Sequence, residues 1–254
     1  MKKSSFLKLS SLALAIATIS TGTYAAQLEE IIVTAQKRAE SLQDAPISMT
    51  ALSGAKISEA GMNSFADLAA YVPNLGISEN ERATGIYMRG VGPGAQQSFE
   101  QSVGLYVDGV HMAKGRQVRT GMFDLAQVEV LRGPQGALYG RNALGGAINL
   151  ISKKPEDEFT FDVGASLGQL DFQRLEAKVN IPVNEQFAIR FSHVDEERDE
   201  GFYSDVNGRD IDTEGYQHTR LTMRFRPSDT VDINYVFDTQ DEVFTDAFRA
   251  RRSL

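Results

Sequence analysis

Apolar and polar residues alternate along the C-terminal part of the chain, and this pattern constrains the fold more than any other feature. From Phe159 to Leu167 every second residue is apolar, and threonine, aspartate, glycine and serine lie between them. The alternation returns over residues 175–181, 187–191, 221–225 and 231–237. A period of two is the repeat of a strand with one apolar face. The region is therefore predicted to form five amphipathic strands.

The links between these strands help to separate two architectures. Residues 182–186 and 226–230 are turn-like, residues 168–174 form a moderate link, and residues 194–218 form a long one. Outer-membrane barrels join their strands by short periplasmic turns and longer external loops, and polar side chains face the lumen. We therefore favour a barrel wall; the alternative is a soluble antiparallel sheet whose apolar face packs on a core. The residues expected to face the lumen are Arg190, Ser192, Arg220, Thr222, Arg224, Asp232 and Asn234.

The first 25 residues are typical of a secretory signal peptide. Lys2, Lys3 and Lys8 form a basic start, an apolar stretch covers residues 12–19, and small residues precede a predicted cut between Ala25 and Ala26. A membrane anchor is the alternative, but a spanning helix needs about 20 consecutive apolar residues. Cleavage would remove three lysines and no acidic residue, so the net charge would pass from -8 to -11. The mature protein is predicted to be acidic and exported.

Composition excludes several functional classes. The chain has no cysteine, so disulfides, thiolate metal sites, cysteine nucleophiles and lipidation after the leader are excluded. A net charge of -8 argues against a nucleic-acid-binding protein, because such proteins bind phosphates through basic side chains. The three histidines, His111, His193 and His218, have no nucleophile motif nearby. We therefore predict no catalytic site and no enzyme.

The glycine-rich stretch between Pro46 and Lys153 is predicted to form a small α+β domain. Its glycines suggest nucleotide binding, but they match neither the dinucleotide fingerprint nor the phosphate loop. We therefore predict no cofactor. Helices are expected over residues 55–60 and after Ser64, where Asp67 lies in capping-box position and Pro73 ends the helix. Strands are expected over residues 47–52, 85–89, 105–110, 128–131 and 147–151.

The long acidic link after residue 194 resembles a calcium-binding loop. Its candidate ligands are Asp205, Asn207, Asp210 and Asp212, but Arg209 stands where the third ligand should lie. A solvated loop explains the acidic residues better. We assign no metal.

Five motifs carry a resemblance to a known family. They are residues 31–35, Tyr87-Met-Arg-Gly90, Leu105-Tyr-Val-Asp-Gly109, residues 128–140 (Val-Glu-Val-Leu-Arg-Gly-Pro-Gln-Gly-Ala-Leu-Tyr-Gly) and residues 141–149 (Arg-Asn-Ala-Leu-Gly-Gly-Ala-Ile-Asn). Together they closely resemble the N-terminal part of a TonB-dependent outer-membrane receptor. The resemblance runs from about residue 30 to the end, and residues 131–149 carry its most specific motifs.

The resemblance implies an active nutrient transporter of the outer membrane. In this family a plug domain fills a β-barrel, binds a scarce nutrient, most commonly an iron chelate, and is opened by the periplasmic domain of the TonB energy-coupling protein. The predicted fold is therefore an α+β plug followed by antiparallel strands of a truncated transmembrane β-barrel. The alternative function is a soluble periplasmic plug-like binding module without transport activity. The residues that contact the nutrient are not assigned.

The resemblance also assigns a partner-binding segment, the TonB box. An extended β-branched peptide suits this role because its backbone can add as a strand to the edge of a partner's sheet. In isolation the same residues would read as an ordinary first strand or a frayed terminus. The predicted TonB box consists of Ile31, Ile32, Val33, Thr34 and Ala35.

Three charged residues of the plug motifs are, by the same resemblance, candidates for plug–barrel contacts. Arg89, Glu129 and Arg132 are expected to form ion pairs that hold the plug within the barrel. The alternative for each is a solvated charge at the end of a strand.

The expected organisation has four parts. Residues 1–25 form the signal peptide, residues 26–45 the TonB-box segment and linker, residues 46–155 the plug region, and residues 156–254 the first strands of an incomplete barrel. An open sheet leaves unpaired backbone groups at its edges, which are costly in hydrocarbon. We therefore expect the chain to be an N-terminal fragment of a longer receptor.

Overall fold

The structure is a computed structural model that describes residues 31–80, 83–93, 100–114, 121–201, 203–204, 208, 210–211 and 213–245. The predicted leader lies outside these residues. Among the helices in this part of the chain, none is long and apolar enough to cross a membrane.

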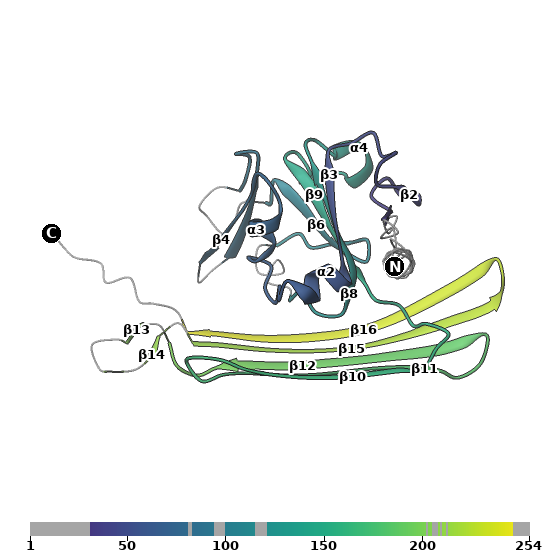
Figure 1. The fold of residues 1–254 in the computed structure, drawn as a ribbon. Helices are drawn as coiled ribbons and strands as arrows, with labels where there is room; N and C mark the ends of the chain where they lie inside the picture. Colours follow the sequence, from purple (N-terminus) through teal and green to yellow (C-terminus); the bar gives the residue numbers. More distant parts are fainter. Residues whose placement is uncertain are drawn as a thin grey trace, which may run out of the picture. The chain divides into compact units, whose positions relative to one another are not determined.

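The plug region is built on a five-stranded mixed sheet (Figure 1). The parallel pair is β6 with β9, and the other neighbours are antiparallel. Asp108 and Gly109 join β6 to β7, both at positive φ, as a two-residue hairpin turn requires. The strands, in order across the sheet, are β3 (Met49–Ser53), β8 (Leu125–Arg132), β9 (Gly146–Ser152), β6 (Val103–Val107) and β7 (Val110–His111).

Three short helices lie between the strands, and side-chain hydrogen bonds mark the starts of the first two. Helix α2 (Gly54–Glu59) starts where Ser53 Oγ accepts a hydrogen bond from Lys56 N at 3.3 Å. Before α3 (Leu68–Tyr71), Asp67 Oδ2 accepts from Ser64 N at 2.9 Å and Ser64 Oγ accepts from Asp67 N at 3.3 Å. These reciprocal bonds confirm the predicted capping box. A third helix, α4 (Gly136–Tyr139), lies between β8 and β9.

A separate hairpin completes the plug core. It consists of β4 (Leu75–Asn80) and β5 (Ala83–Met88), and only β5 was expected from the sequence. The apolar sides of the helices, this hairpin and the five-stranded sheet meet in one buried cluster. Its fully buried members include Leu68, Ile86, Met88, Leu105, Val128, Val130 and Ile148.

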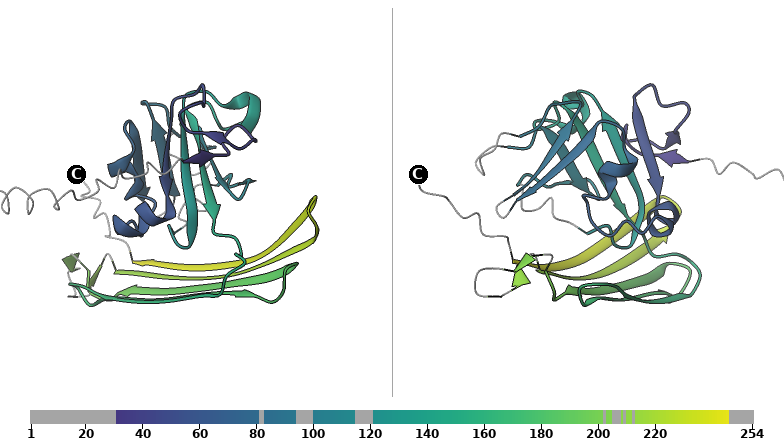
Figure 2. Two further views of the ribbon diagram at one scale, coloured as in Figure 1. Left: turned by 45° about the vertical axis from the view of Figure 1, so that its right-hand side comes forward. Right: turned by 60° about the vertical axis from the view of Figure 1, so that its left-hand side comes forward.

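The C-terminal sheet contains the five predicted strands in sequence order, β10-β11-β12-β15-β16. Every neighbouring pair is antiparallel, and the strands remain side by side in both views of Figure 2. A short hairpin of β13 (Tyr203–Ser204) and β14 (Asp210–Ile211) lies between β12 and β15. The five strands are β10 (Thr160–Leu167), β11 (Phe172–Pro182), β12 (Phe187–Arg198), β15 (Thr213–Ser228) and β16 (Val231–Thr245).

The link between β12 and β15 is shorter than the predicted link over residues 194–218. Strand β12 continues to Arg198 and β15 begins at Thr213, and their last pair joins Arg198 to Glu214. The apolar alternation stops earlier because these strand ends carry charged side chains, which pair with one another. The backbone ladder continues where the hydrophobic pattern ends.

The C-terminal sheet exposes its apolar face and buries its polar face, which is the reverse of a soluble sheet. Phe159, Phe161, Val163 and Leu167, at the start of the sheet, are 65%, 64%, 67% and 83% exposed. Polar side chains of the other face are buried: Arg174, Asn180, Arg190, Ser192, Arg220, Thr222 and Arg224. A soluble sheet would bury its apolar face, whereas a barrel wall presents that face to lipid.

Candidate functional site

The predicted TonB box, which we call the N-terminal segment, lies against the plug region. Strand β1 (Ile32–Val33) pairs with β2 (Glu40–Ser41), and Leu42 N donates to Ile31 O at 2.9 Å. Val33 and Ala35 are fully buried, whereas Ile32 is 48% exposed. The segment therefore has the alternating character of a strand laid on a surface.

A buried carboxylate holds the middle of this segment. Glu129, on β8, accepts hydrogen bonds from Thr34 N at 2.6 Å and from Thr34 Oγ1 at 3.3 Å. It also accepts from Gln127 Nε2 at 3.0 Å and from Asn149 Nδ2 at 3.3 Å. Glu129 is fully buried, and the donors that bind it within the described residues are all neutral. Hydrogen bonds to a charged acceptor are the stronger kind, which makes Thr34 a firm attachment point.

A buried phenol holds the end of the segment. Tyr139, the last residue of α4, donates through its hydroxyl to Ala35 O at 2.7 Å and accepts from Asn149 Nδ2 at 3.2 Å. Burial raises the pKa of Tyr139 well above its ordinary value, and the Glu129 charge raises it further, so the hydroxyl keeps its proton. We call Glu129, Tyr139 and Asn149 the dock.

The three predicted plug–barrel residues make contacts inside the plug region. Glu129 belongs to the dock, Arg89 Nη2 donates to Ser48 Oγ at 3.2 Å, and Arg132 Nη2 donates to Met49 O at 3.1 Å. Among the described residues, none of the three has a hydrogen bond or ion pair to the C-terminal sheet. Their role between plug and barrel stays a prediction.

A buried ion pair that sequence reasoning missed joins the plug region to the C-terminal sheet. Arg190 on β12 donates through Nε to Asp124 Oδ2 at 2.8 Å and through Nη2 to Asp124 Oδ1 at 2.5 Å. Both side chains are 3% exposed. The position of Arg190 on the polar face was expected, but Asp124 lies in no recognisable motif. A single aspartate before a strand gave no signal of its distant partner.

Aromatic packing adds a second contact beside this pair. Phe123 forms a buried cluster with Val194 of β12 and Tyr216 of β15. Tyr216 Oη lies 2.9 Å from His218 Nδ1, and His218 Nε2 lies 2.6 Å from Asp238 Oδ1. His218 is therefore a buried side chain of the polar face, in a hydrogen-bonded network.

The described residues contain no group of three or more histidine, aspartate or glutamate side chains that could hold a metal ion. Of the calcium-like positions, 205, 207, 209 and 212 lie outside the described residues. Glu196 and Glu214, near the ends of β12 and β15, pair with Arg174 at 2.5 Å and Arg198 at 3.2 Å. These two glutamates are therefore paired with arginine side chains.

Comparisons with known proteins identify the plug region. Residues 41–147 match the family model of the TonB-dependent receptor plug domain. The chain is 32% identical to the pesticin receptor of Yersinia pestis over 61% of its own length and 23% of that receptor. It is 34% identical to the catecholate siderophore receptor Fiu of Escherichia coli K12 over 59% of its own length and 19% of that receptor.

A solved structure extends the likeness beyond the plug region. The crystal structure of the ferric yersiniabactin uptake receptor FyuA from Yersinia pestis superposes with a TM-score of 0.71 at 25% identity, over 77% of this chain and 32% of that one. The aligned region spans less than a third of the relatives' own length. Residues 41–147 therefore form a TonB-dependent receptor plug domain, and the chain is similar to the N-terminal part of TonB-dependent outer-membrane receptors, with the C-terminal sheet as the antiparallel strands that follow the plug.

Proposed function

We propose that this chain works in TonB-dependent uptake of a nutrient, an iron–siderophore complex, across the outer membrane. The observation that carries the proposal is the attachment of a plug domain to the polar face of a sheet whose apolar face is exposed. Asp124 binds Arg190 on the polar face, while Phe161 and Leu167 of β10 are exposed. Such a sheet suits the boundary between lipid and a filled lumen.

We also propose that the N-terminal segment is the TonB box and that the dock holds it at rest. Strand addition needs unpaired backbone groups on the segment. In the docked position Thr34 N and Ala35 O are already bonded to Glu129 and Tyr139. The segment would therefore exchange these bonds for bonds to the coupling protein.

A peptide of residues 26–45 tests this assignment directly. Val33→Pro removes a backbone donor and fixes φ, so the proline peptide should bind the periplasmic domain of TonB more weakly. A Lys37→Ala peptide is the control, because position 37 lies outside the segment. Equal affinities for the native and Val33→Pro peptides, measured by calorimetry, would refute the assignment.

The names of the relatives supply the candidate cargoes. They include receptors for catecholate siderophores, ferric yersiniabactin and ferric pyoverdine. We expect a strain without this gene to lose uptake of radioactive iron presented as one of these three chelates, and the restored gene to recover it only in the presence of TonB. Unchanged uptake of all three chelates would contradict the iron–siderophore assignment.

Localisation follows from the same proposal. We propose that the signal peptide is cut between Ala25 and Ala26 and that the protein reaches the outer membrane. N-terminal sequencing of protein from the outer-membrane fraction should begin at Ala26. Recovery of the protein only from the soluble periplasmic fraction would contradict the proposal.

A further inference from the structure

A buried serine on β12 lies between two cationic side chains of the C-terminal sheet. Ser192 is paired with Lys178 of β11 on one side and with Arg220 of β15 on the other. Arg190 lies two residues before Ser192 and shares its face, because side chains alternate along a strand. Ser192, Arg190 and Arg220 are 1%, 3% and 3% exposed. We call Ser192, Arg190 and Arg220 the basic cluster.

Each residue of the basic cluster has a buried polar atom without a hydrogen-bond partner. Among the described residues, nothing accepts from Arg190 Nη1 or from Arg220 Nη1, and Ser192 Oγ is also unbonded. The Cβ atoms of directly paired residues on antiparallel strands lie about 5 Å apart, so these side chains are neighbours. Buried polar groups are almost always bonded, to protein, to water or to an ion. Three free atoms in one place therefore indicate an occupant that the described chain does not supply.

The carboxylates beside the basic cluster are engaged on other atoms. Asp124 binds Arg190 through Nε and Nη2, and Asp238 accepts from Arg220 Nε at 2.8 Å. Asp238 Oδ1 also lies 2.6 Å from His218 Nε2. A guanidinium has five N–H donors and no acceptor, so each arginine still presents donors beyond its carboxylate. The occupant must therefore accept hydrogen bonds.

Lys178 adds a third positive charge beside the basic cluster. Its Nζ donates to Glu176 Oε1 at 2.9 Å and lies 5.1 Å from the centre of the Phe123 ring. Glu176 also accepts from Arg174 Nη2 at 3.1 Å, so this carboxylate is shared between two cations. The charges around Ser192 therefore favour a negatively charged occupant.

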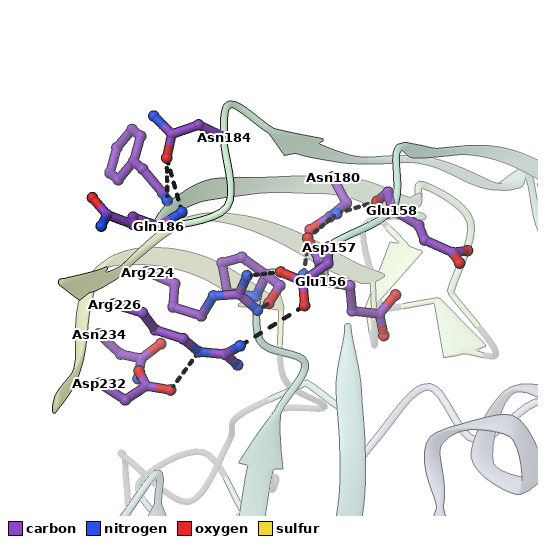
Figure 3. A network of polar contacts seen from close by, with 12 residues as sticks. Glu156, Asp157, Glu158, Asn180, Asn184, Gln186, Arg224, Arg226, Asp232 and Asn234 are labelled. Atoms are coloured by element: carbon purple, nitrogen blue, oxygen red, sulfur yellow. Dashed lines mark hydrogen bonds and ion pairs between the residues drawn. The ribbon is translucent and has the colours of Figure 1, made fainter. Parts of the chain in front are cut away.

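Asn180, two residues beyond Lys178 on β11, shows that burial alone does not leave polar atoms free. Asn180 is 0% exposed and is paired with Arg190. Its Nδ2 donates to Glu156 O at 3.0 Å and to Glu158 O at 2.5 Å, and its Oδ1 accepts from Glu156 N at 2.9 Å (Figure 3). The backbone before β10 thus satisfies this amide. No described group does the same for the three free atoms of the basic cluster.

We propose that the basic cluster binds a small inorganic anion, chloride or an ion of similar size, between β12 and β15. The free N–H donors are unsuited to a metal cation, and hydrogen bonds between charged partners are the stronger kind. Because Asp124 of the plug region binds Arg190, the anion would lie beside the contact between the plug region and the C-terminal sheet. The proposal goes beyond the proposed uptake and depends on neither the cargo nor TonB.

The line width of the chloride NMR signal tests this proposal on the protein extracted in detergent from outer membranes of cells that express the gene. Chloride that exchanges with a protein site gives a broader signal than free chloride. We expect the native protein to broaden the signal relative to detergent buffer alone, and excess bromide to remove the broadening by competition. Heat-modifiable migration on gels reports whether each variant is folded.

Two substitutions of Ser192 and one control separate the site from general charge effects. Ser192→Ala removes one donor to the anion and should weaken chloride binding about tenfold. Ser192→Asp places a carboxylate in the basic cluster and should abolish the broadening. Asn234→Asp adds the same charge at an exposed position, where Asn234 Nδ2 donates to Asp232 at 2.6 Å (Figure 3), and should keep the native broadening.

The comparison between variants decides the outcome. Lost broadening in Ser192→Asp with native broadening in Asn234→Asp supports the anion site. No broadening by the native protein would show that water satisfies the free donors, and would overturn the proposal. Equal loss in Asn234→Asp would indicate a general charge effect and overturn it as well. Native affinity in Ser192→Ala, which also decides the matter if Ser192→Asp does not fold, would exclude the basic cluster as the site.

Discussion

The dock leads to a quantitative prediction about release of the N-terminal segment. In Glu129→Gln the neutral amide oxygen can still accept from Thr34 N, which lies 2.6 Å from the carboxylate in the native protein. Hydrogen bonds to charged groups contribute about 1.5–3 kcal/mol, whereas neutral ones contribute about 0.5–1.5 kcal/mol. The Thr34 bond should therefore weaken by about 1–1.5 kcal/mol. The new amide group, in the place of Oε2, would also face the donor of Asn149.

A loss of this size should raise the population of released segment about tenfold. Because the chain has no cysteine, a single Ala35→Cys substitution reports release through the rate of reaction with a thiol reagent. Ala35 is fully buried, so labelling requires the segment to leave the dock. Ile32→Cys, at a position that is 48% exposed, controls for reagent access.

We expect Glu129→Gln to accelerate labelling at position 35 about tenfold and to leave labelling at position 32 nearly unchanged. Equal labelling rates at position 35 with and without the Glu129→Gln change would refute the dock as the restraint. Equal acceleration at both positions would point instead to unfolding of the plug region.

Three further predictions follow from the plug contacts. Burial raises the pKa of Tyr139 above its ordinary 10.0, so the folded state holds the phenolic proton more tightly than the unfolded chain. Docking of the N-terminal segment should therefore be complete below pH 10 and weaken above it. Tyr139→Phe should abolish this alkaline dependence, measured as labelling at position 35 relative to position 32. Asp124→Asn leaves Arg190 without its buried partner and should destabilise the protein by about 3–5 kcal/mol in thermal unfolding, while adding Arg190→Met should recover part of the loss; a double variant no more stable than the single one would contradict this. Residues 26–155 alone should unfold cooperatively in urea, since they have the size and apolar core of a domain, and a broad transition would count against an independent plug.

Local patterns predicted most of the elements. The period-two alternation located the five strands of the C-terminal sheet, and the Ser64 and Asp67 spacing located a helix start. Strand β4 was missed because Leu75-Gly-Ile-Ser-Glu-Asn80 mixes a glycine and polar residues with only two apolar ones. Whether an element was predicted or missed depended on the pattern of residues close together in the chain.

The contacts of the candidate site could not be read in this way. Thr34 and Glu129 are 95 residues apart, Ala35 and Tyr139 are 104 apart, and Asp124 and Arg190 are 66 apart. The motifs drew attention to Glu129, but they did not show that its partner in the structure is the N-terminal segment. Tyr139 and Asn149 lay inside recognised motifs without a role, and only the fold brings them together.

Uptake by cells that carry Val33→Pro tests the central claim most directly. The initial rate of uptake of radioactive iron should be measured with the chelate that the native gene transports, beside binding of that chelate at low temperature. If the N-terminal segment couples transport to TonB, Val33→Pro should retain binding and reduce uptake to the rate seen in a strain without TonB. Native uptake by Val33→Pro cells, in a strain whose native protein requires TonB, would contradict the account.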